Sequence, residues 1–414
     1  MLGLAAACLL ACFRVWLLAA VAGLTVFTAW LEAPMLGNHW LLAAMISSVL
    51  LAALWPDPHD MAAVARRFVP VAAAVTVVAY GFMAFSKLNT AFLDPSVSCA
   101  VHFASQLVTS WQLPSIEASS LRMVVLATAL AAELSVPVLL ALRRTRMIGV
   151  VVGLAFHGVI ALDLRQHFWD FSAVLLPLFL LFAPGPLVER VLTELSRPRR
   201  LVAVGVWLVV LLTLALPPSA LTPSIVTSCG HLMWFATLGT LLIVLVRHLR
   251  AGTAWSEVVL PRWPGGAWLV VPVLAAINGL TPYLEIKTAS AFNMYANLRT
   301  DRGTTNHLLV PRTWPLTAVH EGLVVVLSTD DRRLRSYVDS GYALPWGEFR
   351  AYLQARPATA VTYRRDGVVY EVRRAGDDRA LMEPVSEVRR RLLAARAVDL
   401  TDPPRCQATW GPAR

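Results

Sequence analysis

The stretch FVPVAAAVTVVAYGFMAFSK, from Phe68 to Lys87, decides the fold class of this chain. From Phe68 to Ser86 it is apolar, and a helix of about 20 such residues crosses the hydrocarbon core of a bilayer. The run ends on a lysine, although the sequence writes arginine almost everywhere else and has only two lysines, Lys87 and Lys287. It therefore predicts a membrane span that ends on an unusual cation.

The rest of the chain shares this apolar character. Of its 414 residues, 57% are hydrophobic and 15% charged, and the mean hydropathy is +0.61. A soluble protein of this length carries more charge. We therefore expect a polytopic α-helical membrane protein of about nine spans. The expected spans lie near Val15–Leu31, His39–Leu54, Phe68–Ser86, Leu121–Leu142, Met147–Asp163, Phe171–Ala183, Leu201–Pro217, Cys229–Val246 and Ala267–Leu280.

The distribution of arginines predicts the orientation, because short cytoplasmic loops collect Lys and Arg. The loop set that includes the N-terminus holds most of them, whereas the opposite set offers only Lys87, Arg122 and Arg165. We predict a plasma-membrane protein with a cytoplasmic N-terminus, including Met1 to Cys12, and an exoplasmic C-terminal part. The net charge of +10 then reflects topology, so membrane lipids and not nucleic acid are the expected partners.

The cysteines carry no metal-binding pattern, and no metal is expected. Three of the five, Cys99, Cys229 and Cys406, fall on the side predicted to be oxidising. One disulfide can form among them, with one thiol left over. The sequence leaves the pair open.

The composition changes near Thr281 to that of a water-exposed domain. We divide the chain into a membrane domain over residues 1–280 and a small exoplasmic α+β domain over residues 281–414. In VTYRRDGVVYEV, Asp366 and Gly367 separate two β-rich runs and predict a two-residue hairpin turn. HEGLVVVLS reads as a strand, and PWGEFRAYLQA and VSEVRRRLLAAR have helical spacing.

Polar residues at membrane depth gather on the predicted exoplasmic side. Asn38 and His39 begin the second span, Lys87 ends the third, and His157 lies in the outer half of the fifth. Such residues need a partner, a wet cavity or a function. Glu133, in the middle of the fourth span, is either a neutral packing carboxyl or a proton carrier.

Lys87 has two interpretations. A lysine at a helix end can extend its amine to the lipid headgroups. In an apolar pocket it can instead lose its proton and act as a base, which arginine cannot do. His39 likewise is either an interfacial cap or a site residue.

Four stretches, taken in order, resemble the vitamin K-dependent gamma-carboxylase family, including its bacterial relatives called HTTM proteins. They are CFRVWLLAAVAGLTVFTAWLEAPMLGNHW, FSKLNTAFLDPSVSCA, FHGVIALDLRQHFWDFSAVLLPLFLLFAP and NGLTPYLEIKTASAFNMYANLRTDRGTTNHLLVP. Together they cover much of the chain between Cys12 and Pro311. The segments around Lys87 and His157 are the most specific.

The resemblance implies that Lys87 matches a catalytic lysine, and that His39, His157 and Asn38 match polar residues of a hydroquinone and oxygen site. Asn89 stands where the family has aspartate and is expected with Asn38 at the cofactor. In that chemistry the lysine deprotonates a reduced naphthoquinone, oxygen adds, and the strong base so formed removes a proton from a peptide glutamate, which takes up carbon dioxide. An apolar site and a tunable amine suit such chemistry.

The chain departs from this family in its much smaller exoplasmic domain and its later start. Two functions are therefore open. The first is an enzyme that uses a reduced quinone and oxygen, acting on a peptide or a small molecule. The second is a non-catalytic membrane protein that binds lipid or quinone or serves as a scaffold, in which the polar groups satisfy one another.

Overall fold

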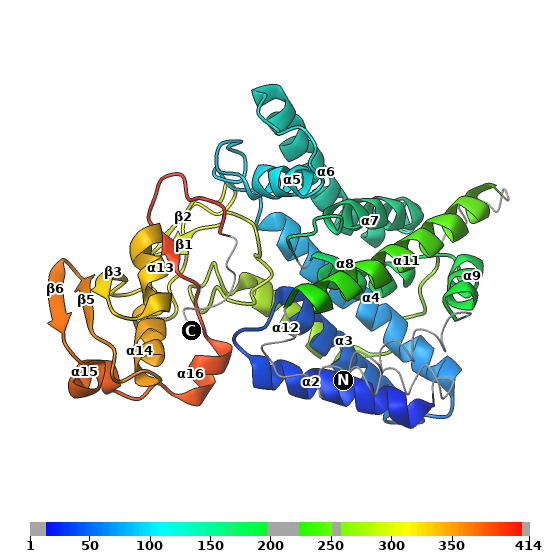
Figure 1. The fold of residues 1–414 in the computed structure, drawn as a ribbon. Helices are drawn as coiled ribbons and strands as arrows, with labels where there is room; N and C mark the ends of the chain where they lie inside the picture. Colours follow the sequence, from blue (N-terminus) through cyan, green and yellow to red (C-terminus); the bar gives the residue numbers. More distant parts are fainter. Residues whose placement is uncertain (1–13, 167, 197–222, 251–257, 408–414) are drawn as a thin grey trace.

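The computed structural model describes residues 14–166, 168–196, 223–250 and 258–407. An apolar helical part and a smaller α+β part lie side by side, at the right and left of Figure 1 respectively. The described helices of the apolar part are α2 (Val15–Glu32), α3 (Asn38–Leu54), α4 (Met61–Phe85), α5 (Cys99–Ser110), α6 (Ser119–Ala141), α7 (Arg146–Ile160), α8 (Phe168–Leu180), α9 (Gly185–Ser196), α11 (Pro223–Arg250), the short η1 (Gly266–Leu269) and α12 (Val270–Leu280).

Among the described residues, four helices are long and apolar enough to cross a membrane: α2, α4, α6 and the segment Gly230–His248 within α11. Four expected spans correspond to shorter apolar helices, namely α3, α7, α8 and the Gly266–Leu280 segment. The expected span Leu201–Pro217 lies outside the described residues. The mostly helical apolar fold is thus as predicted, whereas the number of nine spans is not established.

Helix α4 is central to the apolar part. It begins at the N-cap Asp60, whose carboxylate accepts a hydrogen bond from the Ala63 amide at 2.8 Å. It packs against α3, α6 and α12. The approach of α12 is close, because a Cβ added at Gly279 would meet the Phe82 ring at 2.2 Å. Glycine at this position therefore lets α12 bring the following loop over the end of α4.

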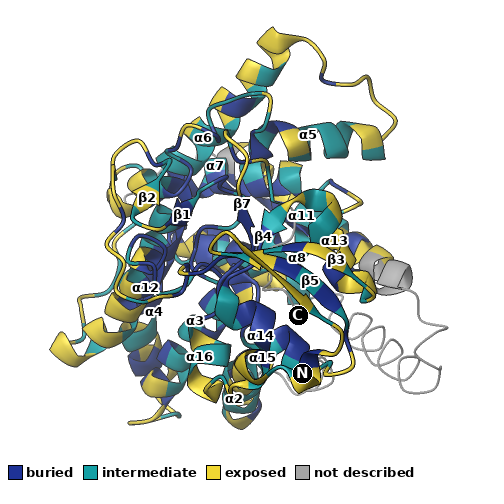
Figure 2. Cartoon of the chain, turned by 90° about the vertical axis from the view of Figure 1, so that its left-hand side faces the viewer, coloured by how far each residue is buried: buried dark blue, intermediate teal, exposed yellow. Residues whose placement is uncertain are grey.

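Large apolar side chains also face outward from these helices. Along α12 the exposed positions recur at helical spacing: Val270, Val273, Leu274, Ile277 and Leu280. Figure 2 shows exposed residues on the outer helices of the apolar part as well as on the α+β part. Contiguous apolar surface of this kind marks a membrane or partner contact.

The α+β part is built around an antiparallel three-stranded sheet in the order β3 (Val324–Thr329), β5 (Val361–Arg365), β6 (Val368–Val372). Helices α13 (Arg332–Ser340) and α14 (Trp346–Gln354) pack on it around Phe349 and Tyr352. The remaining elements are β1 (Thr300–Asp301), β2 (Thr304–Thr305), β4 (Tyr342–Ala343), η2 (Ala375–Asp377), α15 (Arg379–Met382), α16 (Glu387–Leu392) and β7 (Val398–Asp399).

The predicted hairpin is confirmed. Arg365 pairs with Val368 across the turn, and Asp366 and Gly367 have φ of 50° and 82°. Two successive positive φ values are what a type I′ turn requires. The strand predicted in HEGLVVVLS and the helix predicted in PWGEFRAYLQA are also present, as β3 and α14.

The loop after α12 returns to the end of α4. The Leu308 amide donates to the Leu88 carbonyl at 2.8 Å, and the Thr90 amide donates to the Asn306 carbonyl at 3.0 Å. Asn306 and Leu308 lie after the expected boundary at 280/281 and before the three-stranded sheet. They nevertheless bond to the helical part. A disulfide between Cys99 and Cys406, 307 residues apart in sequence, adds a covalent link. It identifies the cysteine pair that the sequence left open.

Candidate functional site

Lys87 follows the end of α4, and its side chain folds back along this helix. Its Nζ donates to the Met83 carbonyl at 3.3 Å and lies 2.7 Å from Oε2 of Glu133. The residue is 8% exposed. The amine is therefore held inside the helical part instead of extending to the headgroups.

The partner carboxylate comes from the middle of α6, which packs along α4. The exposed fractions of the Lys87 and Glu133 side chains are 9% and 15%, so the pair is largely desolvated. One proton shared between amine and carboxylate leaves the pair neutral overall, which is the inexpensive arrangement in an apolar setting. Moving that proton to Glu133 would free the amine as a base without changing the net charge.

His157, on α7, forms a second polar pair with α4. Its Nε2 lies 3.1 Å from the Tyr80 hydroxyl, and both residues are 3% exposed. The Ser172 hydroxyl donates to the His157 carbonyl at 3.1 Å and so joins α8 to α7. The Nδ1 atom of His157 is buried with no hydrogen-bond partner among the described residues. Because a buried polar atom without a partner is costly, it is a candidate contact for a ligand.

His39 begins α3 and forms a third pair, with its Nε2 at 3.4 Å from Oδ2 of Asp170 on α8. Within the described part of the chain, neither ring nitrogen of His39 has a partner in hydrogen-bond geometry. The Phe171 ring lies 5.7 Å from the His39 ring and 5.1 Å from the His157 ring. The Phe171 side chain therefore lies between the two imidazoles. Asn38, which precedes His39 in the sequence, is also buried.

Asn89 has a different role from the one expected. Its Nδ2 donates to the carbonyls of Ser86 and Ala296 at 2.8 and 2.6 Å. Its Oδ1 accepts from the Phe92 amide at 2.8 Å and from Asn306 at 3.2 Å. A primary amide has two donors and one two-lone-pair acceptor. All are used within the chain, so Asn89 anchors the returning loop and has no capacity left for a cofactor.

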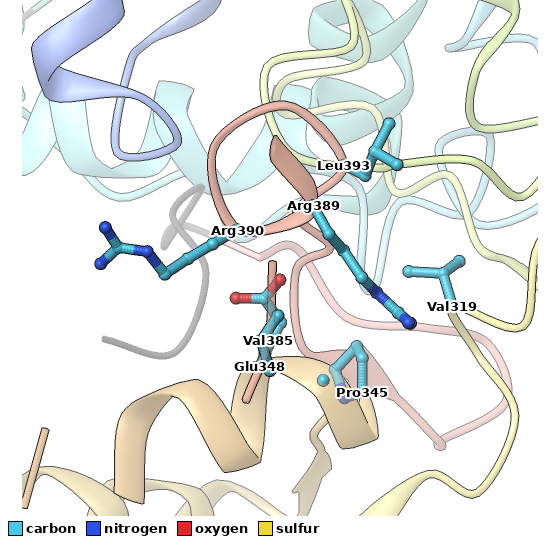
Figure 3. A pocket seen from close by; sticks show the side chains of 8 residues that line it. Val319, Pro345, Glu348, Val385, Arg389, Arg390 and Leu393 are labelled. Carbon is cyan, nitrogen blue, oxygen red and sulfur yellow. The ribbon is translucent and has the colours of Figure 1, made fainter. Parts of the chain in front are cut away.

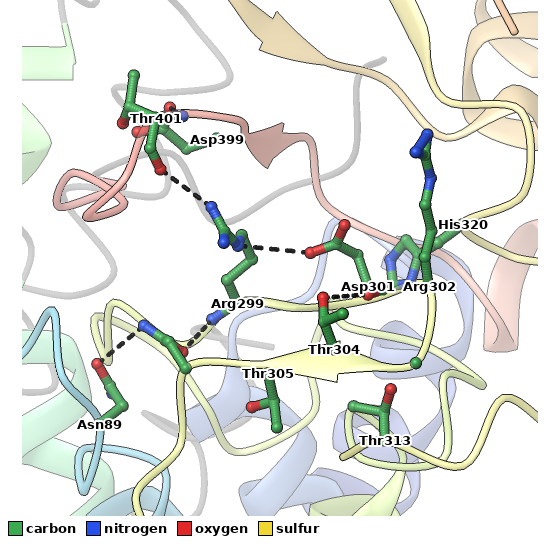
Figure 4. A network of polar contacts seen from close by, with 12 residues as sticks. Asn89, Arg299, Asp301, Arg302, Thr304, Thr305, Thr313, His320, Asp399 and Thr401 are labelled. Carbon is green, nitrogen blue, oxygen red and sulfur yellow. Dashed lines mark hydrogen bonds and ion pairs between the residues drawn. The ribbon is translucent and has the colours of Figure 1, made fainter. Parts of the chain in front are cut away.

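The polar contacts continue from Asn89 into the α+β part, as Figure 4 shows. Asn306 joins Asn89 to the Arg299 amide, which donates to the Asn306 side chain at 2.9 Å. Arg299 Nε then lies 3.5 Å from Oδ1 of Asp301. This network fixes the loop over the end of α4, the helix that Lys87 follows.

Glu285 is the buried centre of a neighbouring network. Its carboxylate accepts from the Gly303 amide at 2.7 Å and from the Thr313 hydroxyl, and Nδ1 of His320 lies 3.6 Å away. Burial alone would raise the pKa of Glu285, but the nearby His320 imidazole and the hydrogen bonds from Thr313 and Gly303 outweigh it and lower the pKa to about 2. The carboxylate is thus ionised at neutral pH and holds the loop between β1 and β2.

A pocket opens between this loop and the C-terminal segment. Arg396 lines it, together with Tyr295, Arg299 and His320. Burial lowers the pKa of Arg396 to about 10, yet it remains charged at neutral pH. Tyr295 contacts the Phe103 and Phe168 rings at 4.6 and 5.5 Å. A cationic lining of this kind suits an anionic ligand.

Lys87, His157 and His39 thus each lie in a separate polar pair, with Glu133, Tyr80 and Asp170 respectively. Neither the Arg396 pocket nor a second pocket beside α16 is lined by any of these three residues. Sequence reasoning did not name Tyr80, Asp170 or Phe171 as members of the cluster. Tyr80 lies seven residues before Lys87 on the same helical face, which is the signal that could have found it.

No family model, no curated protein and no solved structure matches this chain. Fold and site together define a class only: a mostly helical protein with candidate membrane spans, a small α+β part, and a buried set of lysine, histidine and carboxylate pairs.

Proposed function

We propose that this chain is an integral membrane enzyme of the gamma-carboxylase and HTTM type, which uses a reduced quinone and oxygen with Lys87 as the general base. The observation that carries the proposal is the buried amine of Lys87, 2.7 Å from Glu133. A base in an apolar site needs a group that can take or return a proton. Glu133 is placed to do so.

Polar and aromatic groups beside Lys87 support the choice of an aromatic diol. The ring nitrogens of His39 and His157 that have no hydrogen-bond partner among the described residues can accept or donate at its oxygens, and Phe171 offers a ring against which it can stack. When bound, a reduced naphthoquinone supplies the reducing electrons and the acidic hydroxyl. The chain's own part is to hold that hydroxyl near Lys87, to accept its proton at Nζ, and to exclude water.

Orientation belongs to the same proposal. We place the N-terminus in the cytoplasm and the α+β part outside, in the plasma membrane. The arginine pattern of the loops supports this. The Cys99–Cys406 disulfide supports it as well, because structural disulfides persist in oxidising compartments. The Arg396 pocket then faces the exoplasmic side and suits an acidic substrate, either a peptide carboxylate or a small molecule.

One observation favours a second candidate, a non-catalytic lipid-binding, quinone-binding or scaffold protein. The three polar pairs of the cluster already give Lys87, His157 and His39 partners within the chain. A bundle that only needed to satisfy its polar groups would have the same contacts.

The test is oxygen consumption by purified protein supplied with chemically reduced naphthoquinones. Lys87→Arg keeps the charge and the apolar stem but cannot give up its proton, so we expect turnover to fall by about 100-fold or more, the usual contribution of a general base. Lys287→Arg, at the only other lysine, is the matched control and should keep wild-type turnover. Wild-type turnover in Lys87→Arg refutes the base role. No turnover in the wild type favours the second candidate.

A further inference from the structure

The short helix α16 joins the α+β part to the end of a candidate membrane span. Nη1 of Arg391 donates to the carbonyls of Trp30 and Leu31 at 2.8 and 3.0 Å, and its guanidinium lies 5.7 Å from the centre of the Trp30 ring. These carbonyls belong to the last turn of α2, where helices leave carbonyls without partners. An arginine at this end of a helix satisfies the hydrogen-bonding capacity of these carbonyls and places a positive charge at the negative end of the helix dipole.

The opposite side of α16 is fixed to the α+β part. A pocket between them is lined by Pro345, Glu348 and Arg389, among others, and Figure 3 shows Arg389 reaching across it while Arg390 points away. The Ala395 amide, just after α16, donates to Oε1 of Glu348 at 3.2 Å. Because contacts hold both sides of α16, its position relative to the end of α2 is fixed.

The face of α16 that is left outward is apolar. Val388 and Leu392 are four residues apart, so they lie on one helix face, and they are 60% and 44% exposed. At the end of α2, which Arg391 contacts, Trp30 and Leu31 are also exposed, at 48% and 52%. A tryptophan at the end of an apolar helix is typical of the bilayer interface.

The charges beside this face are basic. α16 contains Arg389, Arg390 and Arg391 against a single acid, Glu387. Arg390 bonds to Glu387 and still leaves 42% of its side chain exposed. An apolar face flanked by arginines is the composition of helices that lie in the headgroup layer, and arginine binds lipid phosphate well.

We propose that α16 is an interfacial membrane contact: Val388 and Leu392 insert below the headgroups, and Arg390 and Arg391 stand at the level of the lipid phosphates. The partner is the lipid surface itself, with a preference for anionic headgroups. The inference rests on α2 crossing the membrane and is independent of the chemistry at Lys87. It gives the α+β part a second attachment to the bilayer, besides the chain connection after α12.

The test uses a fluorophore sensitive to polarity on single cysteines, with Cys8, Cys12 and Cys229 replaced by serine and the disulfide kept. Val388→Cys is compared with Val369→Cys on β6, which is similarly exposed at 53%, and with Ile277→Cys on α12 as a lipid-facing reference. Each labelled protein is placed, one copy per disc, in lipid nanodiscs with and without lipids that carry a doxyl quencher near the glycerol backbone.

We expect the label at 388 to be blue-shifted and quenched by the doxyl lipid, as at 277, and the label at 369 to be neither. Equal, water-like emission at 388 and 369 overturns the proposal. A blue shift at 388 without lipid quenching also overturns it, because the face is then covered by protein. In Arg390→Glu the extra quenching gained from anionic over neutral lipid should be lost, while the 369 signal and the disulfide stay unchanged.

Discussion

The contact between Lys87 and Glu133 is defined well enough to predict how its loss changes the free energy of unfolding. With side chains only 9% and 15% exposed and 2.7 Å between the charged atoms, it is a desolvated ion pair. Removing one partner of such a pair leaves an unpaired buried charge and costs about 3 to 5 kcal/mol, whereas replacing both with neutral groups of similar shape is often close to neutral. We therefore expect Glu133→Gln to reduce the free energy of unfolding by about 3 kcal/mol.

Lys87→Met should also be destabilising, because it leaves the buried carboxyl without its cation. The double variant should regain most of the loss from Glu133→Gln, which gives a coupling energy of about 2 kcal/mol between the two sites. The assay is reversible unfolding in detergent micelles or bicelles, with the four proteins of the cycle measured under identical conditions. Additive effects, with a coupling below about 0.5 kcal/mol, refute the buried ion pair.

Three further predictions follow from the α+β part. A cysteine introduced at Ser336 should react with an impermeant thiol reagent in intact cells, and labelling only after lysis would reverse the proposed orientation. Gly367→Val should destabilise the hairpin by about 1 to 2 kcal/mol, since it forces a β-branched residue to positive φ. Gly367→Asn serves as the control, because asparagine is tolerated at positive φ. Equal unfolding midpoints for these two variants contradict the turn. Glu285, with a pKa of about 2 in the folded protein, should contribute about 3 kcal/mol of stability above pH 4.5, and this contribution is lost as the pH falls toward 2. If Glu285→Gln loses as much stability as the wild type over this pH range, the prediction is refuted.

Much of the helical part could be predicted from the sequence, because an apolar run is a local property. The run ending at Ser86 and the helix α4 end one residue apart, and the turn at Asp366 and Gly367 needed only those two residues and their flanks. Local signals also explain an omission. Helix α9, with mixed charge over Gly185–Ser196, was not predicted, because it lacks the apolar run that was the criterion for the expected spans.

The pairing inside the site could not be predicted in the same way. Whether Glu133 meets Lys87 depends on how α6 is rotated against α4, and the sequence does not give that rotation. Asn89 illustrates the same limit, since its amide is used by Ala296 and Asn306, more than 200 residues away. Position at membrane depth indicated which residues are costly. Tertiary packing decided which partner satisfies each one.

The disulfide between Cys99 and Cys406 imposes an order on biosynthesis. During synthesis, Cys99 appears 307 residues before its partner, so its thiol must wait while almost all of the remaining chain is made and inserted. In that interval Cys229 is synthesised on the same predicted side and is available as a wrong partner. In the orientation proposed above, we expect correct pairing to need thiol–disulfide exchange after the last helix is in place.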